Sequence, residues 1–402
     1  MATVQKFDDV SREELIRRAA ALRPMIAEYA GEAEKNNRIP DEVIQAMREG
    51  DFFRILQPRR YGGLEYDLET VVRCLYEWGS ADASTGWVAA LAVVHQWVFA
   101  QFPIECQDEI WGDDPGAIAC GSYAPAGECV AVDGGFRIAG EYHFTSGADI
   151  ADWILLGVFF PPEKEGDKPA PGFTYARKEE IEILDNWKVM GLAGTGSKTV
   201  VARDLFVPGY RRLTFAELAS DNSPGCRVHG NNLYRYPMLS FVPYTIATAA
   251  LGALNGALED FTASVTGRET RGAVVLGGLK VREFQAVQMR VGKAAANLKA
   301  ARAMLFEQIA RSHEKMVVRG EMLDLADRLD NRVAQAKMIE LAVEGLEELF
   351  GAVGGQGINL SNRVQRAWRD AHAIAHHVSF NWDAISSMYG QHLMGLEPQG
   401  QY

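Results

Sequence analysis

The sequence contains little cysteine and no excess of basic charge, and each shortage excludes a class of protein. Five cysteines stand among 402 residues, and no two of them form a CxxC pair. An odd count argues against a disulfide framework, so we expect a reducing, cytoplasmic setting. Aspartate and glutamate outnumber lysine and arginine by 53 to 41. This balance argues against nucleic acid or an anionic membrane surface as a partner.

Three chemical signatures are also missing. The most apolar window, residues 87–102, contains a histidine and two glutamines and is too short to span a bilayer, so we expect a buried helix and no membrane partner. The sequence has no GxGxxG fingerprint for a dinucleotide. Neither an HExxH motif nor a carboxylate completes a ligand set around His372, His376 and His377, so no metal site is expected.

Helical signals dominate both ends of the chain. Ser11 and Glu14 form a capping box in front of apolar residues at helical spacing. From residue 281 onward, apolar residues follow the 3.6-residue period over many turns. Helices with such long apolar stripes usually bury more than one face, and we therefore expect an oligomer, specifically a homotetramer.

The middle of the chain has a different character, with short apolar or alternating runs bounded by glycine, proline and aspartate. Asp133 and Gly134 separate two such runs, which is a strong hairpin signal. This spacing predicts an antiparallel β-barrel or sandwich. The runs lie at residues 118–123, 129–132, 136–138, 153–160, 172–176, 187–190 and 199–207.

The order of these signals predicts an α+β protein of three parts. An N-terminal α-helical domain is expected over residues 1–114, and a central β-domain over residues 115–215. A C-terminal helical bundle is expected over residues 216–402. A chain of this length can bury a core in each part.

One stretch combines aromatic and hydroxyl side chains. Residues 142–147 read Tyr-His-Phe-Thr-Ser-Gly, so that two hydroxyls and an imidazole stand beside aromatic rings. Rings offer stacking area and hydroxyls bond edge atoms, a combination that suits a planar, polar-edged heterocycle. The alternative is a strand that ends in a plain Thr-Ser turn.

Three segments together resemble the acyl-CoA dehydrogenase fold. EYHFTSGADIADW, at residues 141–153, resembles the flavin-contacting strand of that superfamily. GLAGTGSKTVVARDLFVP, at residues 191–208, resembles its glycine-rich turn and following strand. GAVGGQGINLSNRVQRAWRDAHA, at residues 351–373, resembles its C-terminal segment. The motifs stand in the correct order over nearly the whole chain, so the resemblance implies an acyl-CoA dehydrogenase-like fold.

The sequence departs from the dehydrogenases at the catalytic base. Family dehydrogenases with a base in this segment carry glutamate about eight residues after an Arg-Asp pair. Counting from Arg369 and Asp370 leads to Val378, and no carboxylate follows until Asp383. Valine cannot remove an α-proton. Some members supply the base from another helix, so an acyl-CoA dehydrogenase stays an alternative.

Two further stretches, STGWVAALAVVHQW and DAHAIAHHVSFNWD, resemble the flavin-dependent monooxygenases of this fold. These are oxygenase components of two-component aromatic hydroxylases. The resemblance implies reduced FMN or FADH2 from a separate NAD(P)H:flavin reductase, O2 as co-substrate and a C4a-hydroperoxyflavin. It implies hydroxylation of an aromatic or heteroaromatic ring, such as a phenol or indole. N- or S-oxygenation by an enzyme of the same fold, or a non-catalytic oligomeric scaffold, would also be compatible with these residues.

The resemblance assigns catalytic roles to Ser146 and His377 at the flavin and to His95 at the substrate, where it could take the phenol proton. Ser146, with Thr145 beside it, is expected at the N5/O4 edge of the flavin; the alternative is a strand-end turn. His377 is expected to hydrogen-bond the flavin peroxide, because a histidine can donate near neutral pH. His376 is its rival, since neighbours on a helix point about 100° apart. His372 is a third choice.

Further residues are assigned to the substrate and the flavin. The resemblance places His95 at the phenol oxygen, whereas its apolar helix alone indicates a core histidine. Trp87 is expected in an aromatic substrate pocket or in the core, and Ser122 at flavin or substrate or in a plain β-turn. Arg268 or Arg271 is expected to pair with the flavin phosphate, unless both belong to a solvated helix end. Cofactor binding is also expected of Gly354, in the C-terminal glycine-rich segment.

Overall fold

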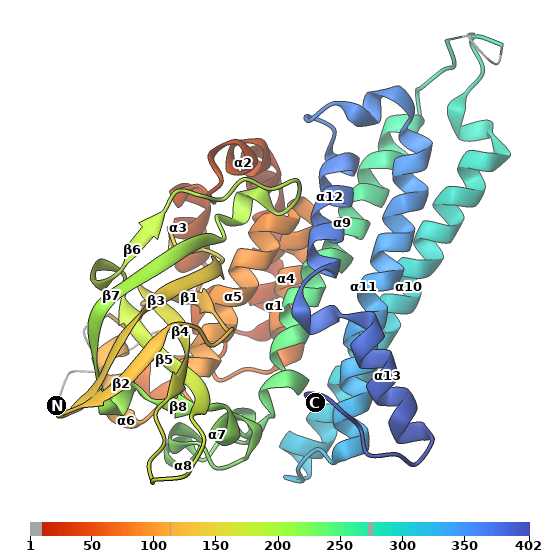
Figure 1. The fold of residues 1–402 in the computed structure, drawn as a ribbon. Helices are drawn as coiled ribbons and strands as arrows, with labels where there is room; N and C mark the ends of the chain where they lie inside the picture. The colour runs from red at the N-terminus through yellow and green to blue at the C-terminus, as the bar shows by residue number, and fades with distance from the viewer. Residues whose placement is uncertain (1–9, 113, 272–275) are drawn as a thin grey trace.

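The computed structural model describes residues 10–112, 114–271 and 276–402, so the first nine residues of the predicted N-terminal domain lie outside it. Figure 1 shows two sheets on the left, the N-terminal helices in the middle and long C-terminal helices on the right. The predicted α+β architecture with helices at both ends is confirmed. The site described below lies where these three parts meet.

The N-terminal helices begin at residues that cap them. Ser11 Oγ accepts a hydrogen bond from Glu14 N at 3.2 Å, and Asp67 and Asp82 cap α4 (Leu68–Ala81) and α5 (Ala83–Phe99). All 17 residues of α5 are buried, because this uncharged helix lies between the sheets and the C-terminal helices. The helices are α1 (Arg12–Ala21), α2 (Arg23–Asn36), α3 (Asp41–Glu49), α4 (Leu68–Ala81), α5 (Ala83–Phe99) and α6 (Ile104–Trp111).

The central strands form two four-stranded sheets and, within the described residues, no closed barrel. The predicted hairpin is confirmed, since Val132 pairs with Gly135 across the turn. Two predictions are wrong. β1 (Ala119–Ser122) and β4 (Trp153–Phe160) pair in parallel. Residues 187–190 form no strand, because the edge position beside β7 (Lys198–Pro208) belongs to β6 (Glu182–Leu184). The sheets are β1 (Ala119–Ser122), β4 (Trp153–Phe160), β5 (Ala170–Arg177) and β8 (Leu213–Thr214), then β2 (Glu128–Val132), β3 (Gly135–Thr145), β7 (Lys198–Pro208) and β6 (Glu182–Leu184).

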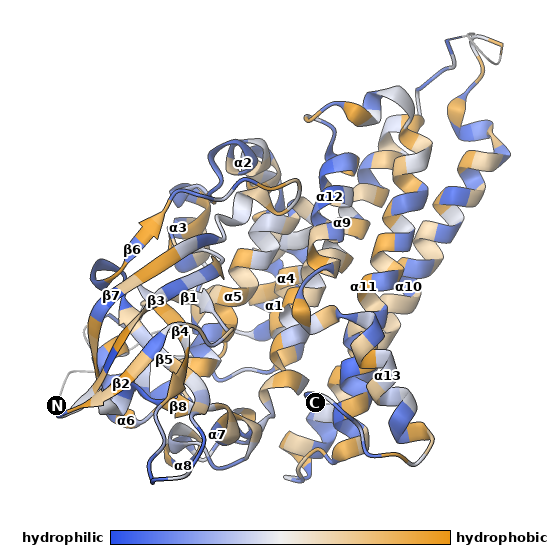
Figure 2. Ribbon diagram, viewed as in Figure 1, coloured by the Kyte–Doolittle hydropathy of each residue, from blue (hydrophilic) through white to orange (hydrophobic). Residues whose placement is uncertain are grey.

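The C-terminal part packs long helices side by side. The stretch Met238–Val265 is long and apolar enough to cross a membrane, but 89% of its most apolar window is buried inside the protein, as expected of a core helix. Figure 2 shows apolar residues gathered on α5 and α9 (Val242–Val265), whereas α10 (Gln285–His313) carries both apolar and polar residues. The helices are α7 (Phe215–Ala219), α8 (Pro224–His229), α9 (Val242–Val265), α10 (Gln285–His313), α11 (Leu325–Val353), α12 (Arg363–Ala375) and α13 (Trp382–Leu393).

Candidate active site

Ser146 is directed into the protein by an irregular end of β3. The pairing of β3 with β7 shifts register between Tyr142 and Thr145. Phe144 has a φ of +59°, which is uncommon for a residue other than glycine. Ser146 N donates to Phe144 O at 2.9 Å and closes a γ-turn. Residues held in such backbone conformations cluster at functional sites.

Gly147 allows this turn to pack directly on α5. Its φ is +74°, and a Cβ there would lie 2.7 Å from Cys120 Sγ and 3.1 Å from a methyl carbon of Val88. A larger residue therefore fits neither the backbone nor the space. Gly147 N also donates to Thr195 O at 2.9 Å, which joins the turn to the short 3₁₀ helix η4 (Ala193–Thr195).

A chain of hydrogen bonds runs through Ser146. Trp87 Nε1 on α5 donates to Ser146 Oγ at 3.1 Å. Ser146 Oγ lies 2.6 Å from Ser197 Oγ, which lies 2.6 Å from Thr195 Oγ1. Thr195 Oγ1 donates to Leu192 O at 2.7 Å. The three hydroxyl side chains are buried, so solvent does not compete for these bonds.

His377 lies against Trp87 from the C-terminal side. The two ring centroids are 5.2 Å apart and the rings meet edge to face at 71°. Ser379 N donates to His377 Nδ1 at 3.2 Å, so the neutral ring carries its hydrogen on Nε2. Burial lowers the pKa of His377 to about 4, and the charge of Arg332 acts in the same direction. His377 is therefore a neutral donor at neutral pH.

Arg332 also fixes the segment that carries this histidine. Its guanidinium is buried and donates to Ser379 O at 3.1 Å and to Gln335 Oε1 at 2.8 Å. Ser379 belongs to the 3₁₀ helix η11 (Val378–Phe380), directly after His377. By contrast, His376 is exposed and its Nδ1 lies 2.8 Å from His372 O. Of these two neighbours, it is His377 that meets Trp87.

His95 occupies a buried polar cluster further along α5. It is 0% exposed, and neither ring nitrogen has a hydrogen-bond partner among the described residues. Its ring centroid lies 5.6 Å from that of Tyr123 and 6.3 Å from that of Tyr175. The hydroxyls of both tyrosines are likewise buried without partners within the described chain. Buried polar atoms are normally paired, so this cluster has the character of a ligand site.

These groups are uncharged at neutral pH. Burial lowers the pKa of His95 to about 3. Burial also raises the pKa of the Tyr123 and Tyr175 hydroxyls above their ordinary range. The cluster therefore offers neutral hydrogen-bonding groups to whatever it binds.

Comparison with known families places the chain. The family description "Acyl-CoA dehydrogenase, N-terminal domain" matches residues 12–111, and "Acyl-CoA dehydrogenase, C-terminal domain" matches residues 244–382. The two matches cover more than half of the chain. The chain belongs to the acyl-CoA dehydrogenase family. The fold predicted from the three motifs is therefore confirmed.

Individual relatives define its branch of the acyl-CoA dehydrogenase family. The chain is 40% identical over 393 residues to the FADH2-dependent resorcinol hydroxylase, oxygenase component, of Rhizobium sp. (strain MTP-10005), covering 96% of each chain. The crystal structure of 3-HSA hydroxylase from Rhodococcus sp. RHA1 is 32% identical, with a TM-score of 0.90 over 96% of this chain and 98% of that one. XiaF from Streptomyces sp., in complex with FADH2 and glycerol, is 25% identical with a TM-score of 0.88 over 97% of each chain. The chain thus belongs with the flavin-dependent monooxygenase oxygenase components.

The base position of the acyl-CoA dehydrogenases lies outside this cluster. Val378, which occupies that position by sequence, is 81% exposed on η11. The hydrogen-bond partners of Ser146 Oγ within the described chain are Trp87 and Ser197, and neither is a carboxylate. The Ser146 hydroxyl is therefore bonded to another hydroxyl and to an indole, whereas the dehydrogenase base would be a glutamate.

The other predicted site residues lie in two places. Ser122 ends β1 beside Tyr123 and is buried. Thr145 adjoins Ser146, but its Oγ1 donates to Tyr142 O at 3.1 Å and is used within the strand. Both residues therefore lie on the sheet side of α5.

Arg268 and Gly354 meet at the far tip of the bundle. Arg268 Nη2 donates to Val353 O at 2.9 Å, and a Cβ on Gly354 would lie 3.2 Å from that nitrogen. Arg271 is exposed nearby in sequence. In Figure 1 the connection after α9 and the end of α11 lie at the top of the bundle, away from the sheets. The structure brings Arg268 and Gly354 together, but apart from Ser146 and His377 of the same chain.

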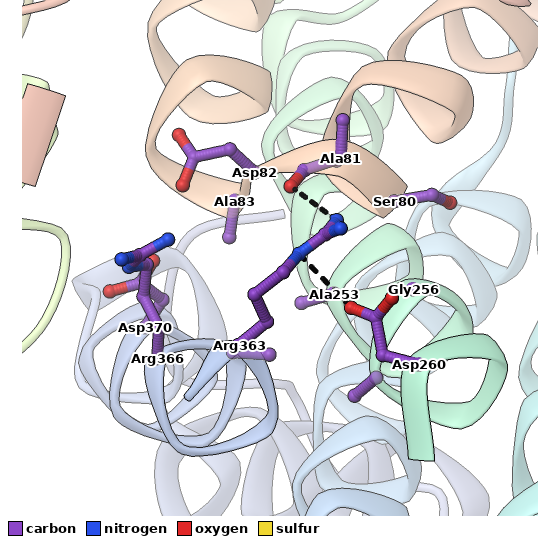
Figure 3. A pocket seen from close by; sticks show the side chains of 13 residues that line it. Ser80, Ala81, Asp82, Ala83, Ala253, Gly256, Asp260, Arg363, Arg366 and Asp370 are labelled. Carbon is purple, nitrogen blue, oxygen red and sulfur yellow. Dashed lines mark hydrogen bonds and ion pairs between the residues drawn. The ribbon is translucent and has the colours of Figure 1, made fainter. Parts of the chain in front are cut away.

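A small polar cavity lies elsewhere, between the α4–α5 turn, α9 and α12 (Figure 3). Its volume of about 20 Å³ has room for about one water molecule and none for a heterocycle. Arg363 crosses it, donating to Ala81 O at 3.3 Å and pairing with Asp260 at 3.0 Å. Asp82 and Asp370 also line the cavity, and burial raises the pKa of both, that of Asp370 to about 7. This cavity belongs to the packing of α12.

Sequence reasoning missed four residues of the site. Ser197 and Thr195 stand in the GLAGTGS turn, where two hydroxyls at i and i+2 offer a signal. Tyr123 directly follows Ser122 and shares its loop. Tyr175 lies within a buried apolar strand and gives no signal that separates it from core. Over residues 10–112, 114–271 and 276–402, no group of three or more His, Cys, Asp or Glu side chains is placed to hold a metal ion.

Proposed function

We propose that this protein is the oxygenase component of a two-component hydroxylase that uses FADH2 and O2 to hydroxylate a phenol. One observation carries the proposal: the buried Ser146 bonds the buried Trp87, and the half-buried ring of His377 lies against the same indole. His95 lies further along the helix that carries Trp87. The FADH2-dependent relatives support the choice of FADH2 over FMN.

The cluster suits the edge of a reduced flavin. Ser146 Oγ accepts from Trp87 Nε1 and keeps a lone pair for a ligand. Trp87 and His377 present aromatic faces and edges, which favour a planar ring system. When bound, a reduced flavin supplies activation of O2 and transfer of one oxygen atom.

His377 would hold a proton at Nε2 without carrying a charge. Its lowered pKa and the Ser379 N–H on Nδ1 keep it a neutral donor over the physiological range. A neutral donor in a buried site strengthens a hydrogen bond while avoiding the desolvation of a charge. The apolar walls of α5 exclude water from the same region.

The His95 cluster would bind the substrate. Its two unpartnered nitrogens can accept one hydrogen bond and donate another, as a phenolic hydroxyl requires. Tyr123 and Tyr175 add two hydroxyls, and Ser122 lies at the end of the adjacent strand. The Rhizobium relative is named for resorcinol, which carries two hydroxyls on one ring. A small phenol matches these neutral groups. Rings that contain nitrogen or sulfur are the other candidate substrates.

The remaining assignments follow from the same proposal. A separate NAD(P)H:flavin reductase would supply FADH2, because the sequence has no dinucleotide fingerprint of its own. We propose a cytoplasmic homotetramer with domains at residues 1–114, 115–215 and 216–402. Arg268, with Arg271 and Gly354 nearby, would bind the phosphate part of a flavin held by another subunit.

The test supplies each reactant separately. The full chain is mixed anaerobically with FADH2 and a phenol or benzenediol, and ¹⁸O2 is then admitted. The proposal predicts a ring-hydroxylated product that carries one ¹⁸O atom. Release of all reducing equivalents as H2O2 with every arene would contradict it. Anaerobic reduction of bound FAD by an acyl-CoA would instead indicate a dehydrogenase.

A further inference from the structure

The hydrogen-bond chain through Ser146 has a fixed direction. Leu192 O can only accept, so the 2.7 Å contact places the hydroxyl hydrogen of Thr195 on that side. The 2.6 Å contact between Thr195 Oγ1 and Ser197 Oγ then needs the hydrogen of Ser197. By the same reasoning, the hydrogen in the 2.6 Å contact between Ser197 Oγ and Ser146 Oγ belongs to Ser146.

The acceptor that ends this chain is itself held in place. Leu192 has a φ of +56°, and its N–H donates to the Asp370 carboxyl at 2.6 Å. Trp187 Nε1 donates to the same Leu192 carbonyl at 3.1 Å. The carbonyl therefore cannot turn away from Thr195 without breaking bonds in a buried region. If the hydroxyls pointed the other way along the chain, Thr195 Oγ1 and Leu192 O would lie 2.7 Å apart without a hydrogen between them.

Ser146 consequently has no hydrogen to offer a ligand. Its hydroxyl donates inward to Ser197 and accepts from Trp87 Nε1, which leaves one lone pair. A serine hydroxyl usually rotates to suit its partner. Here the neighbours remove that freedom, and Ser146 faces the site as an acceptor.

We propose that the chain Ser146–Ser197–Thr195 makes the site discriminate between the oxidation states of the flavin. The inference rests on the proposed function, in which Ser146 lies at the flavin N5 edge. A reduced isoalloxazine carries a hydrogen on N5, which can donate to Ser146 Oγ. An oxidised isoalloxazine carries a lone pair there and meets a second acceptor. Ser197 and Thr195 are thus positioning residues that favour the reduced cofactor and release the oxidised one.

Dissociation constants for the two oxidation states test the proposal. They are measured anaerobically for FADH2 and aerobically for FAD, by equilibrium dialysis of the full chain. In Ser197→Ala the Ser146 hydrogen loses its acceptor and becomes free to point at the flavin. We expect FAD to bind more tightly and FADH2 less tightly, so that the ratio of the two constants falls about tenfold. Thr195→Val should move the ratio in the same direction.

Two variants serve as controls. Ser197→Thr keeps the hydroxyl and should restore the wild-type ratio. Thr174→Val removes the hydroxyl of another fully buried threonine, on β5, whose Oγ1 has no partner within the described chain. It should leave the ratio unchanged. If Ser197 had a purely structural role, Ser197→Ala would weaken the binding of FAD and of FADH2 by the same factor. That result would overturn the proposal.

The outcomes separate this inference from the proposed function. A wild-type protein that binds FAD as tightly as FADH2 and still hydroxylates phenols contradicts the inference alone. A protein that prefers FADH2, loses the preference in Ser197→Ala and hydroxylates no arene contradicts the proposed function alone.

Discussion

The two histidines of the site, His95 and His377, are uncharged at neutral pH. His95 and His377 both have a pKa lowered by burial, to about 3 and about 4. Each ring therefore acts through hydrogen bonds rather than charge at neutral pH. The partner on Nδ1 determines which nitrogen of His377 carries the hydrogen, whereas His95 keeps both nitrogens open for a ligand.

Replacing His377 should uncouple oxygen activation from hydroxylation. In His377→Ala the donor beside Trp87 is lost. Loss of one hydrogen bond changes an equilibrium or rate constant by about one order of magnitude. We expect the yield of hydroxylated phenol per FADH2 consumed to fall about tenfold, with a matching rise in H2O2. His313→Ala, on α10, is the control and should keep the wild-type yield. An unchanged yield in His377→Ala would exclude the proposed role.

The buried His95 should make the protein sensitive to acid. The unfolded chain takes up a proton on this residue near pH 6.5, but the folded chain does so only near pH 3. The folded state therefore loses about 1.4 kcal/mol of stability per pH unit as pH falls between these values. His95→Gln removes this contribution. Urea unfolding from pH 4 to 6 should show a shallower pH dependence for the variant, and equal slopes would contradict the assignment.

At the scale of elements, the site depends on how α5 and α12 dock. Asp82 caps α5, which carries Trp87 and His95, and Asp370 on α12 accepts from Leu192 N. A Cβ on Gly191 would lie 2.2 Å from Arg369 O, so the turn before Leu192 touches α12 directly. This contact joins the hydroxyl chain of Ser146 to the helix that leads to His377.

Asp370→Asn should stabilise the docked helices at alkaline pH. Burial and the neighbouring Asp82 raise the pKa of Asp370 to about 7, against an ordinary value of 3.8. The folded state therefore binds this proton more tightly than the unfolded chain does. The resulting stabilisation is complete below pH 3.8 and is lost as the pH rises through about 7. Asparagine keeps an oxygen for Leu192 N and removes the charge.

Calorimetry at pH 5.5 and pH 8 measures this effect. The melting temperature of Asp370→Asn should exceed that of the wild type by more at pH 8 than at pH 5.5, equivalent to about 1–2 kcal/mol. Glu49→Gln on α3 is the control, because Glu49 lies outside this junction. Gln365 on α12 is not used, because it bonds Arg369. A difference that is the same at both pH values would show that Asp370 does not titrate in this range.

For the whole molecule, sequence patterns predict the elements better than their pairing. The hairpin at Gly134 and the long helices follow from local signals. The parallel pairing of β1 with β4 depends on contacts between distant segments, which no local pattern encodes. Residues 187–190 resemble a strand in composition, but Trp187 bonds Leu192 O and the stretch forms a loop.

The residues of the site also differ in how far the sequence predicts them. Ser146, His377 and His95 could be named only from the resemblance to a family, because local pattern alone is equally compatible with an ordinary turn or core residue at each position. The structure adds their mutual placement, with Trp87 between Ser146 and His377. Tyr175 could not be predicted, because an aromatic residue on a buried strand is normally core.

The assembled molecule should contain four chains. Phe144 and Met190, close in sequence to the site, are 71% and 59% exposed, and Arg268 follows the C-terminal end of α9, at the tip of the bundle away from the sheets (Figure 1). A second copy would cover the apolar side chains and bring Arg268, proposed above to bind the flavin phosphate, to the flavin. Light scattering should give four times the chain mass of 44.3 kDa. A mass of one chain would contradict the shared site.

A crystal structure of the protein with FADH2, prepared without oxygen, would show where the flavin binds. We expect an isoalloxazine ring with N5 within hydrogen-bond distance of Ser146 Oγ and with His377 Nε2 facing the same ring. A flavin bound away from both side chains would contradict this expectation.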